Sequence, residues 1–142
     1  MTDAANLSGY WSGWYAYHAQ IRVPAVPFTA WLEVSADGHL SGSTTEPNTF
    51  ARTDTQELFA DLTGEAGRDW VTFIKTYQAM PGLEASPIGY SGDVTEDGAK
   101  ITGVWTIDLG TRSYQGSFEL HRASSSQRAR METEKSAAND LL

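Results

Sequence analysis

The feature that most constrains this chain is a period-two alternation of apolar and polar residues, cut into short segments by glycine and proline. This alternation is typical of half-buried β-strands, and no helical period of useful length competes with it before residue 122. The predicted strands cover residues 9–21, 28–35, 39–45, 57–64, 69–77, 88–95, 100–107 and 113–121. Eight short strands in succession favour an all-β, antiparallel up-and-down meander, and closure into a barrel removes its exposed edges.

Three turn sequences predict the register of this meander. VSADGHL places Gly38 at the left-handed position of a three-residue hairpin loop, and VTEDGAKI and LTGEAGRDWV are interpreted in the same way. The expected cross-strand pairs are Val34 with Leu40, Val94 with Ile101, and Leu62 with Val71. Each pair is apolar and lies on one face, so the turns and the hydrophobic pattern agree.

The length of 142 residues fits one domain, and 40% hydrophobic residues suffice for a core. We expect an N-terminal tail over 1–8, the barrel over 9–122 and a polar tail over 123–142, either flexible or a short helix capped by Ser126. The net charge of −8 disfavours nucleic acid and anionic membrane surfaces as partners. With no signal-peptide pattern, no membrane-length apolar run and no cysteine, the expectation is a soluble cytoplasmic protein.

The alternation also sorts the aromatic residues by face. Trp11, Tyr15 and Tyr17 are expected to point inward, while Tyr10 and His18 point outward. Further large outward residues are Trp14, Trp31, Trp70 and Ile74. Several exposed rings together suggest an interface. We therefore expect either a homodimer through Trp14, Trp31 and Trp70 or a monomer with an apolar outer wall.

The beginning and the end of the barrel resemble those of a known group of proteins. Gly9-Tyr10-Trp11 is similar to the G-x-W motif of the calycins, the lipocalin, fatty-acid-binding and avidin group. Arg122 resembles the basic residue that in many calycins packs over that tryptophan. The resemblance implies an eight-stranded barrel closed at its base by Trp11 and Arg122, with strand lengths closer to avidin than to lipocalins. It does not extend to the biotin-contacting residues of avidin.

A binding site is expected at the opposite end, where the connections after the first, third, fifth and seventh strands are longer. The candidate ligand-binding residues nearest this mouth are Tyr17, Phe28, Lys75, Tyr77, Tyr90, Trp105 and Tyr114. Lys75 has three interpretations: an anchor for an acidic group of a ligand, a side chain that reaches solvent past the rim, or a residue turned outward by a bulge. A small barrel filled by its own side chains, with no pocket, is a further alternative.

No familiar catalytic or metal-binding pattern is evident. The alternation places no acidic residue and no histidine pair on the inward face, so paired-carboxylate chemistry, a metal site and a cofactor are not expected. The first functional hypothesis is binding of a small, largely apolar and either neutral or acidic molecule. The alternatives are a cofactor-free cyclase or isomerase that uses the same pocket, and a filled-barrel interaction module.

Overall fold

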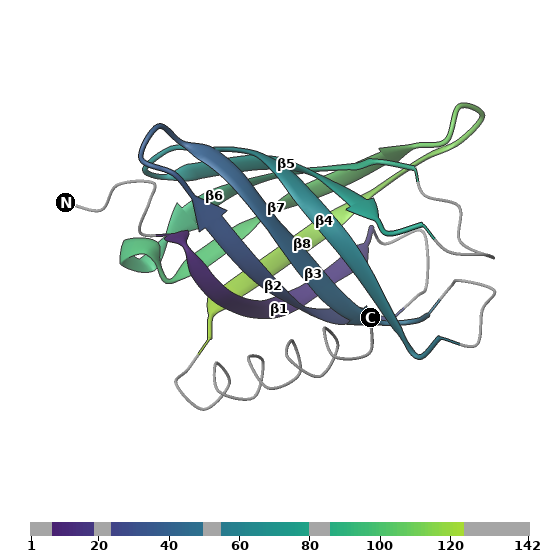
Figure 1. Cartoon of the computed structure of the whole chain (residues 1–142). Coiled ribbons are helices and arrows are strands. Elements are labelled where there is room, and N and C mark those ends of the chain that lie inside the picture. The colour runs from purple at the N-terminus through teal and green to yellow at the C-terminus, as the bar shows by residue number, and fades with distance from the viewer. Residues whose placement is uncertain (1–6, 19–23, 50–54, 80–85, 124–142) are drawn as a thin grey trace.

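A computed structural model describes residues 7–18, 24–49, 55–79 and 86–123 (Figure 1). In this part of the chain, eight antiparallel strands form a closed barrel in which each strand pairs with its neighbours in sequence and β8 returns to β1. The strands are β1 (Gly9–Tyr17), β2 (Val26–Val34), β3 (His39–Pro47), β4 (Glu57–Ala66), β5 (Trp70–Tyr77), β6 (Ile88–Thr95), β7 (Lys100–Asp108) and β8 (Ser113–Arg122). The predicted fold class is confirmed.

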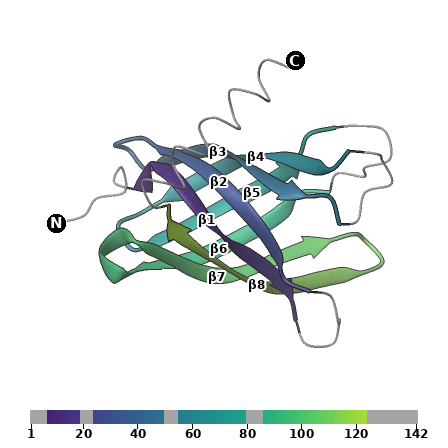
Figure 2. The same cartoon turned by 90° about the horizontal axis from the view of Figure 1, so that it is seen from below.

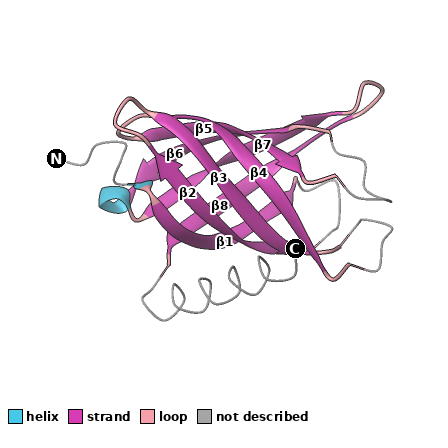
Figure 3. Ribbon diagram, viewed as in Figure 1, coloured by secondary structure: helices cyan, strands magenta, loops and turns pink. Residues whose placement is uncertain are grey.

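The two ends of the barrel differ in their connections. The turns β2–β3 and β4–β5 lie at one end, together with the short 3₁₀ helix η2 (Glu96–Gly98) between β6 and β7 (Figure 3). At the other end, the long-loop end, β1, β3 and β5 finish and β2, β4 and β6 begin (Figure 1). The expected long loop after β7 is instead a tight turn, in which the Leu109 amide donates to the Arg112 carbonyl at 2.7 Å. The reason is that β7 and β8 stay paired as far as Asp108 and Ser113.

The register agrees with two of the three predicted pairs. Val34 pairs with Leu40, and Val94 pairs with Ile101. The third prediction was wrong, because Leu62 pairs with Lys75 and Val71 pairs with Ala66. β4 continues through Gly64 to Ala66, and the turn forms around Gly67, whose amide donates to the Trp70 carbonyl at 2.9 Å. The slip of four residues preserves the inward face, since side chains alternate with a period of two.

The short-turn end is sealed by Trp11 and Arg122. Trp11 is fully buried, and its indole nitrogen donates to the Leu7 carbonyl at 2.9 Å. The Arg122 guanidinium lies 4.6 Å from the centre of the Trp11 ring and donates to the carbonyls of Ser8 and Gly98, both at 3.2 Å. One cation thus covers the ring and joins the start of β1, η2 and the end of β8.

The outer tryptophans lie on two parts of the wall. Trp14 and Trp31 are on the adjacent strands β1 and β2, whereas Trp70 is on β5, which is not adjacent to either (Figure 2). Tyr10 faces outward as expected but is nearly buried, because the Trp31 ring packs 4.6 Å from it and the Ala123 amide donates to its carbonyl. Trp70 is 43% exposed. The homodimer stays a prediction.

Both predicted tails fall largely outside the described residues, which begin at Leu7 and end at Ala123. Leu7 belongs to the main core cluster rather than to a free tail. Among the described residues, no helix has the length and apolar character needed to cross a membrane. The cytoplasmic location stays a prediction.

We expect Trp11→Ala to destabilise the fold by about 3–5 kcal/mol, because truncation of a buried tryptophan leaves a cavity and here also removes the ring beneath Arg122. Urea unfolding followed by circular dichroism measures this loss. Trp70→Ala is the matched control on the exposed wall and should cost far less. Equal losses in the two variants would contradict the sealed base.

Candidate functional site

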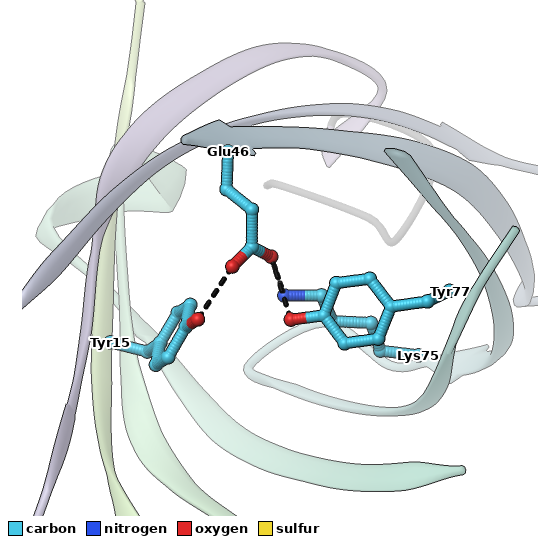
Figure 4. Close-up of polar contacts among 4 residues, drawn as sticks. All are labelled: Tyr15, Glu46, Lys75 and Tyr77. Carbon is cyan, nitrogen blue, oxygen red and sulfur yellow. Dashed lines mark hydrogen bonds and ion pairs between the residues drawn. The ribbon is translucent and has the colours of Figure 1, made fainter. Parts of the chain in front are cut away.

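A cluster of four polar side chains lies inside the barrel toward the long-loop end (Figure 4). The Lys75 ammonium contacts Glu46 Oε1 at 2.6 Å, and the Tyr77 hydroxyl donates to the same oxygen at 2.8 Å. The Tyr15 hydroxyl donates to Glu46 Oε2 at 2.5 Å. Glu46 and Lys75 are 2% and 1% exposed, so this is an ion pair enclosed by the barrel. The cluster joins β1, β3 and β5, which are not neighbours in the sheet.

Aromatic rings surround the Lys75 ammonium on the sides that Glu46 leaves open. Its nitrogen lies 4.8, 4.9, 5.2 and 5.7 Å from the ring centres of Tyr15, Tyr77, Phe28 and Tyr90. These distances allow cation–π attraction, which is strongest where water is excluded. Tyr15 and Tyr77 therefore contact both charges, because their hydroxyls donate to the Glu46 carboxylate and their rings face the Lys75 ammonium. Tyr90 contacts only the ammonium through its ring.

Burial and the charge of Glu46 shift the titration of the surrounding groups. Burial raises the pKa of Tyr15, Tyr77 and Tyr90 well above the ordinary 10.0, and the negative charge of Glu46 raises it further. Burial lowers the pKa of Lys75 from its ordinary 10.5, and the attraction of Glu46 offsets part of this shift. The three tyrosines consequently stay protonated, with Tyr15 and Tyr77 as donors to Glu46, and Lys75 gives up its proton more easily than an exposed lysine does.

The wall beside this cluster is interrupted. The β2–β3 ladder ends at Thr29 and Thr45, although β2 begins at Val26 and β3 continues to Pro47. Continued in register, the ladder would place Pro27 opposite Pro47, and neither proline has an amide hydrogen to donate. The first three residues of β2, Val26 to Phe28, therefore pair only with β1. The last two residues of β3, Glu46 and Pro47, pair only with β4.

A groove with a volume of about 380 Å³ lies over this interruption. It is lined by Ser12, Gly13, Pro27, Phe28, Thr29, Thr45, Glu46, Pro47, Gln56 and Glu57. Phe28 and Glu46 also contact the Lys75 ammonium inside the barrel. The groove therefore lies on the outer wall at the long-loop end, and its lining is continuous with the ion pair in the interior. Its volume exceeds the lower bound of about 300 Å³ for ligand pockets.

The residues predicted to line the mouth fall into two groups. Phe28, Lys75, Tyr77 and Tyr90 lie around the ion pair. Tyr17, Trp105 and Tyr114 form a second group, in which the Tyr17 ring is 5.0 Å from Trp105 and 6.4 Å from Tyr114. The two groups meet at Tyr15, whose ring is 6.1 Å from Trp105. Tyr17 and Tyr114 are half-buried, whereas Trp105 is buried and donates to the Ala16 carbonyl.

The expectation that no acidic residue faces inward was wrong, because Glu46 does. The predicted strand stopped at residue 45, since Pro47 indicated a loop, but the alternation Leu40, Gly42, Thr44 continues to Glu46. The proposals that Lys75 reaches solvent or turns outward at a bulge were also wrong: it is buried and paired with Ile88 and Leu62 in regular ladders. An unpaired inward lysine was itself a signal that a carboxylate had been missed.

Other predicted groups contribute less to the site. Glu57 begins β4 and is exposed at the groove. The described part of the chain contains no group of three or more metal-binding side chains. Comparison with protein-family models, curated proteins and solved structures found no match. The fold and the site therefore define only a class: a closed eight-stranded antiparallel barrel with a buried, aromatic-lined ion pair.

We expect Lys75→Met to destabilise the protein by about 3 kcal/mol or more, because it leaves the buried Glu46 without its cation. The double variant Glu46→Gln/Lys75→Met should recover most of this loss, since it removes both charges and keeps a partner for the two tyrosine hydroxyls. Urea unfolding of the wild type, the two single variants and the double variant measures the coupling. Additive effects would show that the two charges do not depend on each other.

We expect the stability to fall above about pH 10.5. An unfolded tyrosine ionises near pH 10.0, whereas folded Tyr15, Tyr77 and Tyr90 keep their protons, so their contribution is complete below pH 10 and is lost as the pH rises. Above about pH 10, each of these tyrosines lowers the free energy of unfolding by about 1.4 kcal/mol per pH unit. Lys75 has the opposite effect, because its pKa is lowered in the folded protein: its contribution to stability increases as the pH rises toward about 10.5, where an unfolded lysine loses its proton. Above that pH it adds no further change. Urea unfolding at increasing pH tests this, and Tyr90→Phe should make the decline less steep.

Proposed function

We propose that the protein binds a small, uncharged and largely apolar molecule at the long-loop end of the barrel, through the groove between β2 and β3. The observation that carries the proposal is the groove of about 380 Å³, whose lining includes Phe28 and Glu46 of the buried cluster. Four of the other eight lining residues are threonine or proline, and their methyl groups and ring carbons suit an apolar molecule with few polar groups.

The charges near the groove favour a neutral ligand over an acidic one. Lys75 is already bonded to Glu46, so it offers no uncompensated positive charge to a ligand carboxylate. Glu57 adds a second negative group at the groove. A ligand carboxylate would have to be desolvated beside these acids, which is unfavourable. A hydroxyl or carbonyl group carries no such penalty.

Membership of the calycin group is part of the same proposal. The closed eight-stranded barrel and the cation over Trp11 support it, because both features were expected from the calycin resemblance. A cofactor-free isomerase or cyclase remains the second candidate. It is favoured by one observation: two tyrosine hydroxyls hold Glu46 in place, and the Lys75 ammonium lies 2.6 Å from it, at a distance that allows a proton to pass between them.

The proposal is tested with a pair of fluorescent probes that share one skeleton. We expect N-phenylnaphthylamine, which is uncharged, to bind with increased fluorescence, and its sulfonated counterpart anilinonaphthalene sulfonate to bind more weakly. Thr45→Trp places a large ring in the groove and should weaken binding about tenfold or more, equivalent to about 1.4 kcal/mol.

Thr72→Trp is the matched control, because Thr72 is an exposed outward residue of β5, away from the groove. It should bind the neutral probe like the wild type. Failure of the wild type to bind either probe would overturn the proposal. Equal binding by Thr45→Trp and Thr72→Trp would move the site away from the groove.

A further inference from the structure

The buried lysine has the surroundings of a reactive amine. Its nitrogen is packed among four aromatic rings and has one charged partner, Glu46, at 2.6 Å. An apolar site disfavours the charged ammonium and so favours the neutral amine. The neutral amine is the form of lysine that attacks carbonyl compounds, because it has a free electron pair. Movement of one proton along the Lys75–Glu46 contact converts the ion pair into a neutral amine beside a neutral carboxylic acid.

Stability alone does not account for the pair. A buried ion pair is often no more stabilising than apolar residues of similar volume, since both charges lose their hydration. Here the pair is also placed next to an opening. Two residues that contact the Lys75 ammonium, Glu46 and Phe28, line the groove where the β2–β3 ladder ends. The groove and the amine therefore share Phe28 and Glu46 as neighbours.

We propose that Lys75 forms a reversible imine with an apolar aldehyde that enters by this groove, and that Glu46 transfers the protons. The inference rests on the proposed function and names its ligand class. Phe28 moves aside to admit the aldehyde, which is easier at this point because the start of β2 is paired on one side only.

The reaction balances with the groups present. Lys75 gives a proton to Glu46, and its nitrogen bonds to the aldehyde carbon while the carbonyl electrons move to oxygen. A proton passes from nitrogen to that oxygen, which gives a neutral carbinolamine. Glu46 then protonates the hydroxyl, the carbon–oxygen bond breaks, water leaves, and the nitrogen electron pair forms the C=N bond. The product is a protonated imine with Glu46 as its counter-ion.

The same cage suits the product. The protonated imine keeps the positive charge at the Lys75 nitrogen, so the carboxylate at 2.6 Å and the four ring faces continue to stabilise it. Tyr15 and Tyr77 hold Glu46 in place from the other side, because their hydroxyls donate to its two oxygens. An added alkyl group is compatible with ring faces, which require no hydrogen bond from the cation.

The chain offers a direct test, because its lysines are Lys75, Lys100 and Lys135. The wild-type protein is incubated with trans-cinnamaldehyde and sodium cyanoborohydride, which reduces an imine to a stable amine, and the labelled lysine is located by peptide mass mapping. Lys75 should be labelled about tenfold or more faster than the partly exposed Lys100, since its ring cage favours the apolar aldehyde and Glu46 lies in position to take up the proton. Glyoxylate, a charged aldehyde, should show no preference for Lys75.

Two variants and one analogue separate the outcomes. Thr45→Trp should slow labelling of Lys75 without changing that of Lys100, and Lys100→Arg should leave Lys75 labelling unchanged. Cinnamyl alcohol has the same skeleton but cannot form an imine. If the alcohol displaces N-phenylnaphthylamine while Lys75 stays unlabelled, the imine is refuted and the proposed function stands. If neither alcohol nor aldehyde binds and Lys75 stays unlabelled, both are refuted.

Discussion

The interior of this barrel is organised by the contact between Glu46 and Lys75. Two charges have been removed from water, and each is acceptable only because the other is present. Tyr15 and Tyr77 occupy further acceptor positions of the carboxylate, and the ring faces occupy the space around the ammonium. The cluster connects β1, β3 and β5 across the lumen, where no ladder hydrogen bonds join them, so it positions three non-adjacent strands through side chains alone.

A second constraint acts at the same level of the wall. Pro27 and Pro47 come from different strands, and their opposed positions end the β2–β3 ladder beside Glu46. A purely apolar interior would gain nothing from such a gap. The interrupted ladder, the groove and the ion pair occur together in one region of the described barrel. This coincidence, more than any single distance, places the candidate site at the long-loop end.

Much of this arrangement was predictable from local pattern, and the errors have local causes. Alternation correctly directed Lys75 inward, and turn chemistry gave the Val34–Leu40 pair. Glu46 was missed because a following proline was interpreted as the end of the strand, although proline is compatible with a strand that has lost its partner on one side. Counting outward from the Val34–Leu40 pair would have placed Pro27 opposite Pro47. The inward lysine indicated that an acid was needed, but which acid pairs with it was not predictable, because that depends on the distance across the lumen between strands that never pair.

The barrel holds one cation against aromatic rings toward each end, and the two cations differ in whether they can lose a proton. At the sealed end Arg122 lies over Trp11 and donates to backbone carbonyls, and a guanidinium does not lose its proton in proteins. At the open end the cation is a lysine, the pKa of which is lowered by burial, and its partner is a carboxylate that can accept the proton. A cation required only for packing could have been an arginine at either end. Of the two cations held against aromatic rings, the one that can become a neutral amine lies beside the groove, where the β2–β3 ladder ends.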